Sequence, residues 1–96
     1  MVMAMPSTNN VPKIGVVKEG RIIASIPEPD LVGLIRDHWE PITRRAQRSG
    51  YPVIPPQDVL RYLDNAEDRQ KDGADVFFAV ALQELERQKA LNPYLN

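Results

Sequence analysis

Eight of this chain's nine prolines lie within its first 56 residues, so only short helices and strands fit between them in that part. Nine of the 96 residues are proline, and Pro27-Glu28-Pro29, Pro41, Pro55-Pro56 and Pro93 all separate apolar segments. Proline lacks a backbone N–H and restrains the residue before it, so strands and helices tend to end at these positions. The sequence therefore predicts brief elements up to Pro56 and leaves room for a longer helix after it.

The length and composition suit one small domain without metal or cofactor. Folding at this size buries roughly 60–65% of the surface of the unfolded chain, so stability is modest. The chain has no cysteine and a single histidine, His38, which excludes disulfides, thiolate zinc sites and multi-histidine metal sites. It has neither an apolar run of ~20 residues nor a signal-peptide pattern. We therefore expect a cytoplasmic protein with no membrane contact.

The N-terminal part of the sequence predicts a hairpin and a helix. Apolar, β-branched runs at 13–17 and 21–26 flank Lys18-Glu19-Gly20, where glycine suits a tight turn. Two strands alone are marginal in water, so we expect the hairpin to join a larger sheet. Apolar residues then recur at helical spacing over 30–38, and residues 1–12 before the hairpin are polar and expected to be disordered.

The middle of the chain holds three closely spaced arginines. Because Pro41 disfavours helical geometry at the preceding residue, we interpret 42–43 and 51–54 as two short strands joined by a polar turn over 44–50. Arginine forks match phosphate oxygens and guanine edges, and hydroxyls can donate to phosphates. The alternative is an ordinary solvated turn. The predicted DNA-binding residues are Thr43, Arg44, Arg45 and Arg48.

The end of the chain predicts two helices, at 57–66 and 74–90, separated by a charged linker over 67–73. Adjacent aromatics in the last helix point about 100° apart, so a single face cannot bury both. This helix is either the core of a homodimer or a segment that docks onto another protein. The predicted partner-binding residues are Phe77, Phe78, Val80, Leu82 and Leu85.

Charge and motifs favour binding over catalysis. Residues 1–55 carry seven Lys/Arg against five acids, and residues 56–96 carry five against eight. This asymmetry suggests two partners of different character, or ordinary surface charge. His38 lies near no nucleophile motif, and the glycines match no phosphate-binding loop. We therefore expect no enzyme activity.

Residues 21–66 resemble the Phd/YefM family of toxin–antitoxin antitoxins. Glu40-Pro41-Ile42-Thr43-Arg44-Arg45 looks like a shortened form of that family's E-P-V-x-I-T-R-R-G segment, and residues 51–58 look like its P-V-A-V-L-V-P-x-E-D segment. The chain departs from the pattern at Trp39 and Ala46, where the family has glycine. The resemblance implies a dimeric DNA-binding front that represses transcription and a tail from about Glu67 that orders on a toxin.

These observations lead to one expected architecture and two expected functions. We expect an α+β fold in which the hairpin and two central strands form a small antiparallel sheet, with two to three helices and an extended C-terminal helix. The expected parts are a disordered 1–12, a core domain over 13–66, and a linker with a partner-binding or dimerisation helix over 67–96. The expected function is an antitoxin-like, DNA-binding repressor that forms a homodimer and binds a protein through its last helix. The alternative is a small interaction module, such as a phage- or mobile-element-type inhibitor or an assembly subunit, that does not bind DNA.

Overall fold

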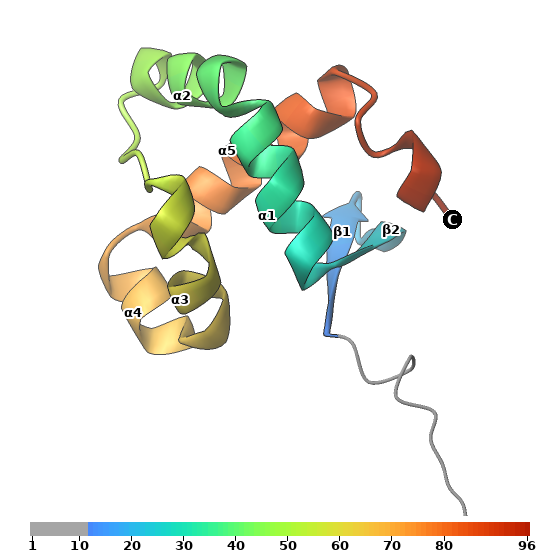
Figure 1. The fold of residues 1–96 in the computed structure, drawn as a ribbon, viewed down its shortest axis with the longest axis horizontal. Coiled ribbons are helices and arrows are strands. Elements are labelled where there is room, and N and C mark those ends of the chain that lie inside the picture. The colour runs from blue at the N-terminus through green and yellow to red at the C-terminus, as the bar shows by residue number, and fades with distance from the viewer. Residues whose placement is uncertain (1–11) are drawn as a thin grey trace, which may run out of the picture.

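A two-stranded hairpin is followed by helices in the computed structural model, which describes residues 12–96 (Figure 1). The segment 1–12, expected to be disordered, lies outside the described residues except for Pro12. Single 3-10 turns lie at Pro56–Asp58 and Asn92–Tyr94. The strands and helices are β1 (Lys13–Lys18), β2 (Arg21–Pro27), α1 (Glu28–Asp37), α2 (Trp39–Arg48), α3 (Val59–Asp64), α4 (Ala66–Lys71) and α5 (Ala74–Arg87).

The predicted hairpin is confirmed. Glu19 and Gly20 have φ values of 53° and 77°, so the two-residue turn between the strands is left-handed and matches their twist. An irregularity between Val16 and Val17 shifts the pairing by one residue. The antiparallel register pairs Lys13 with Pro27, Ile14 with Ile26, Gly15 with Ser25, Val16 with Ala24, Val17 with Ile22 and Lys18 with Arg21.

The larger sheet expected around this hairpin is not formed by residues 12–96. The sheet contains β1 and β2 alone. The outer edge of β2 is instead covered by the C-terminal residues, since Leu95 bridges Ala24 and the Asn96 N–H donates to the Ile23 carbonyl at 3.0 Å. A short piece of this chain therefore already pairs with one edge of the hairpin.

The two predicted central strands are wrong, and this corrects the expected fold class. Residues 42–43 lie inside α2, and so do the arginines that were expected in a turn. Pro41 is the third residue of α2, where no intrahelical hydrogen bond is needed, and the first such bond joins the Ile42 N–H to the His38 carbonyl at 3.2 Å. Trp39, Ile42 and Ala46 recur at helical spacing and form the apolar side of this helix.

The other predicted central strand, 51–54, is irregular chain. Pro52 removes one backbone donor within the segment and Pro55 removes another directly after it, so the segment is a poor strand despite its apolar residues. Ile54 alone is fully inserted into the core from this segment. The predicted charged linker at 67–73 is also shorter than expected, because Asn65 accepts the Asp68 N–H at 3.0 Å and begins α4.

Helix α5 lies at the centre of the fold. Phe77 and Phe78 are only 0% and 7% exposed although they point in different directions, because separate surfaces cover the helix. The Phe77 ring lies 5.8 Å from the Trp39 ring of α2 and 6.0 Å from that of Phe78. Burial of such a side chain stabilises the fold by about 1.5–3 kcal/mol. The other largest buried side chains are Ile26, Leu31, Ile35, Ile42, Val59, Leu85 and Leu91.

The described helices are all shorter than a bilayer requires. The longest, α5, has 14 residues, and within residues 12–96 none combines the length and apolar character needed to cross a membrane.

Candidate functional site

The predicted DNA-binding residues lie along α2, where they have different environments. Arg44 and Arg48 are exposed one turn apart on the outer side of the helix. Arg45 instead reaches across to α5, where it donates to Gln83 at 3.2 Å. The hydroxyl of Thr43 is buried without a hydrogen-bond partner among the described residues, so it is not presented to a phosphate in this structure. Three arginines of the predicted set, but not Thr43, thus face outward or toward α5.

Glu84 of α5 organises this region. It is 3% exposed, and its Oε2 accepts from Arg87 Nη2 at 2.6 Å and Nε at 3.0 Å. Gln88 donates to the same oxygen at 2.9 Å, and Arg45 Nη1 lies 3.4 Å from Oε1. The Arg87 hydrogen bonds, together with those from Gln88 and Arg45, outweigh burial and lower the pKa of Glu84 to about 2. Glu84 therefore stays ionised and holds two arginines beside each other.

Four arginines converge at this place, and we call Arg44, Arg45, Arg48 and Arg87 the arginine cluster. They surround a hollow of about 360 Å³ whose other lining residues are Pro41 and Glu84. Arg44 also pairs with the exposed Glu40 at 2.6 Å. Within residues 12–96 the ion pairs of these four arginines involve two carboxylates, those of Glu40 and Glu84, so the cluster keeps a positive excess and suits an anionic ligand.

Sequence reasoning missed Arg87 and Glu84. The signal available was their spacing of three residues in a predicted helix, which indicates an ion pair and nothing about its surroundings. Their approach to Arg45 depends on the packing of α2 against α5, which periodicity does not reveal.

The predicted partner-binding residues of α5 contact the chain's own core. Phe77, Phe78, Val80 and Leu85 are buried, and Leu82 is half-buried. They are brought together on one helix as expected, yet as the chain is folded here their side chains pack mostly against its own elements. Of the set, Leu82 and the edge of Phe78 border an open groove.

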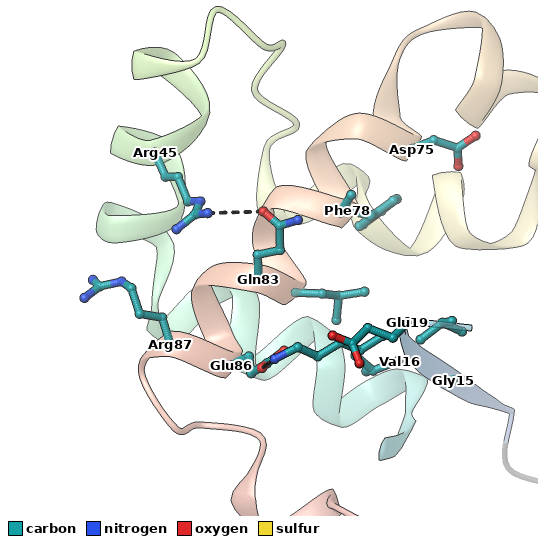
Figure 2. A pocket seen from close by; sticks show the side chains of 13 residues that line it. Gly15, Val16, Glu19, Arg45, Asp75, Phe78, Gln83, Glu86 and Arg87 are labelled. Carbon is teal, nitrogen blue, oxygen red and sulfur yellow. Dashed lines mark hydrogen bonds and ion pairs between the residues drawn. The ribbon is translucent and has the colours of Figure 1, made fainter. Parts of the chain in front are cut away.

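This groove runs between β1 and α5, and we call it the β1–α5 groove (Figure 2). It has a volume of about 860 Å³, and its apolar lining comes from Val16, Val17, Phe78, Ala79 and Leu82. Lys18 of β1 pairs with Glu86 of α5 at 2.6 Å and ties the two elements together. The groove and the arginine cluster share two residues, so they form one continuous surface. The shared residues are Arg45 and Arg87.

The chemistry that this surface offers is binding. Within residues 12–96, no three or more His, Cys, Asp or Glu side chains are grouped so as to hold a metal ion. His38 is the half-buried link between α1 and α2, and no side-chain hydrogen bond to it is formed in the described part of the chain. Arginines, an apolar groove and a strand edge are the means of recognising anions and polypeptides.

Comparison with known proteins adds no relative. No protein-family model, no curated protein and no solved structure matches this chain.

Proposed function

We propose that this is a non-enzymatic macromolecule-binding protein of the antitoxin-like repressor type, whose arginine cluster contacts the phosphates of DNA. One observation carries the proposal: arginines from two helices, far apart in sequence, converge on a single hollow with a positive excess. Arginine suits this role because its planar fork donates two parallel hydrogen bonds to phosphate oxygens.

The arrangement also orders part of the cluster before binding. Glu84 fixes Arg45 and Arg87 in position, so less side-chain entropy is lost when they meet a phosphate. Arg44 and Arg48 remain exposed on the neighbouring helix and extend the positive surface outward. Helix α2, about 15 Å long at 1.5 Å per residue, offers this face over a length comparable to the width of a DNA groove.

The protein-binding half of the proposal belongs to the outer side of α5. The aromatic residues first considered for this role are buried, so the partner would meet Leu82 and the β1–α5 groove. Repression of this kind is carried out by dimers, and a homodimer is part of the proposal.

A second candidate is an interaction module that does not bind DNA. The β1–α5 groove favours this candidate because it is a preformed concave surface. The net charge of −1 also favours it, since DNA-binding domains usually carry more positive charge. Glu40 and Glu84 also meet part of the arginine charge.

Fluorescence anisotropy with a labelled duplex DNA separates the two candidates. We expect the natural protein to bind at low salt and Arg44→Gln/Arg48→Gln to bind about tenfold more weakly, since two phosphate contacts are lost. The matched control is Arg36→Gln/Lys71→Gln, which removes the same charge from exposed positions on α1 and α4. Equal weakening by both variants would show that only net charge matters, and no binding by the natural protein would leave the second candidate.

A further inference from the structure

The two outer edges of the hairpin differ in the described part of the chain. The edge of β2 is paired with Leu95 and Asn96, as described above. Within residues 12–96, no backbone hydrogen bond joins the outer edge of β1, from Ile14 to Lys18, to another segment. A strand edge with unpaired N–H and C=O groups is a template on which an extended segment can add.

The edge of β1 opens onto a groove of suitable size and character. Residues 15–18 of β1 and Glu19 of the turn form one wall, and the outer side of α5 forms the other (Figure 2). Its volume of about 860 Å³ lies within the range of about 300–1,000 Å³ that binding pockets occupy. The more exposed apolar residues of the lining, Val17, Ala79 and Leu82, offer apolar contacts to the side chains of such a segment.

The positive charge at one end of the groove indicates which charged group its ligand carries there. Arg45 and Arg87 line this end and share one carboxylate, that of Glu84, which leaves a positive excess. At the beginning of α5 the groove is lined by Asp75, whose carboxylate pairs with Arg69 at 2.7 Å. An acidic group therefore fits the Arg45–Arg87 end and gains a charge-assisted hydrogen bond there.

The same observations argue against a second copy of the chain and against DNA in the groove. Antiparallel pairing of two β1 strands about their centres would set Lys13 of one copy opposite Lys18 of the other, and like charges directly opposite are unfavourable. The groove lining also includes Glu19, Asp75 and Glu86, which repel a phosphate backbone.

We propose that the β1–α5 groove binds an extended peptide segment of a protein partner, which pairs with the outer edge of β1 and places an acidic side chain or a C-terminal carboxylate between Arg45 and Arg87. This inference rests on the protein-binding half of the proposed function. The groove shares Arg45 and Arg87 with the arginine cluster, so the peptide test uses Ala79, which lines the groove but not the cluster, and the DNA test uses Arg44 and Arg48, which line the cluster but not the groove. It names the chemistry of the partner: an apolar stretch of about four to six residues, the length of one strand, with an acid at one end.

The test is selection of peptides from a random twelve-residue phage-display library on the full-length protein. The probe is then a fluorescein-labelled synthetic copy of an enriched peptide. We expect enriched sequences to have alternating apolar residues and an acid near one end, and to bind with a dissociation constant on the order of 1 μM. Replacement of that acid by its amide should weaken binding about tenfold. In a ¹⁵N NMR titration the amides of β1 should shift.

Two variants locate the peptide. Ala79→Arg adds a long side chain to the groove wall from an exposed position, so folding is retained and peptide binding should fall at least tenfold. Ala66→Arg, on the exposed start of α4 and outside the groove, is the matched control and should bind as the natural protein does.

Other outcomes overturn the proposal. It is wrong if selection on the natural protein enriches no peptide beyond those enriched on Ala79→Arg. It is also wrong if Ala79→Arg binds the peptide as the natural protein does, or if replacing the acid by its amide does not weaken binding. It is also wrong if analytical ultracentrifugation shows a dimer that Ala79→Arg dissociates, because a second copy would then fill the groove. Duplex DNA binding measured on the same preparations reports separately on the arginine cluster, so failure of the groove proposal and failure of the DNA proposal are distinguished.

Discussion

Glu84 shows how a single buried carboxylate can join two helices and a binding surface. At 3% exposure it would be costly to keep charged without partners, but Arg87, Gln88 and Arg45 surround it. The same contacts fix two of the arginines proposed to meet phosphate. Glu84 therefore has a structural role in stability and a proposed role in positioning arginines for a ligand, and the two roles can be measured separately.

The pH dependence of stability tests the structural role of Glu84. Its pKa is lowered from 4.5 to about 2 on folding, so its contribution is present above about pH 4.5 and is lost as the pH falls toward 2. In urea unfolding at pH 7, Glu84→Gln should lower the free energy of unfolding by about 1–3 kcal/mol, a range that allows for solvent screening at the 63% exposed side chain of Arg87.

Near pH 2 the natural protein and Glu84→Gln should have the same stability. The control is Glu40→Gln, which removes an exposed pair with Arg44 and should change stability by less than about 0.5 kcal/mol. A stability difference for Glu84→Gln that does not change with pH would contradict the assigned pKa.

In contrast to Glu84, we predict for Thr43 that substitution does not lower the free energy of unfolding. Its hydroxyl is buried and unpaired among residues 12–96, so the isosteric Thr43→Val should leave the free energy of unfolding unchanged or raise it by about 1 kcal/mol. DNA binding should stay the same, because the hydroxyl is not offered to a ligand. A large loss of DNA affinity in Thr43→Val, measured by the anisotropy assay, would show instead that the hydroxyl contacts DNA.

At the scale of elements, the sequence predicted those whose signals are local. The hairpin was found because β-branched runs flank Glu19-Gly20, and α1 because its apolar residues have helical spacing. Helix α2 has two conflicting signals, because Pro41 indicates a break whereas the spacing of Trp39, Ile42 and Ala46 indicates a helix. Proline in the first turn of a helix removes no hydrogen bond, so the spacing was the better signal.

The same distinction holds for the candidate site. Arg44, Arg45 and Arg48 were found from the sequence because they are neighbours in the chain. Their relation to Glu84, Arg87 and the groove depends on the packing of α2 and β1 against α5, and no local pattern encodes that packing.

Ile42 tests whether α2 is a helix that packs on α5. Its side chain is fully buried, so Ile42→Ala should lower the free energy of unfolding by about 2–4 kcal/mol through lost burial and a residual cavity. Gln47→Ala, exposed on the same helix, is the control and should change it by less than about 0.5 kcal/mol. Similar small effects for both would mean that this helix does not pack as described.

At the scale of the whole molecule, the last third of the chain completes the core. Phe77, Ala81 and Leu85 of α5 are fully buried against other elements, so a chain that ends at Asp68 should lack a cooperative thermal transition followed by circular dichroism. The full-length chain should show one. A cooperative transition in the truncated chain would instead support an independent core domain over 13–66.

The central claim is that the arginine cluster binds DNA phosphates, and the salt dependence of binding tests it most directly. The logarithm of the binding constant falls linearly with the logarithm of salt concentration, by about 0.9 per phosphate contact. We predict that Arg44→Gln/Arg48→Gln reduces this slope by about 2 relative to the natural protein, and that Arg36→Gln/Lys71→Gln leaves it unchanged. Equal slopes for the natural protein and the cluster variant would contradict the claim.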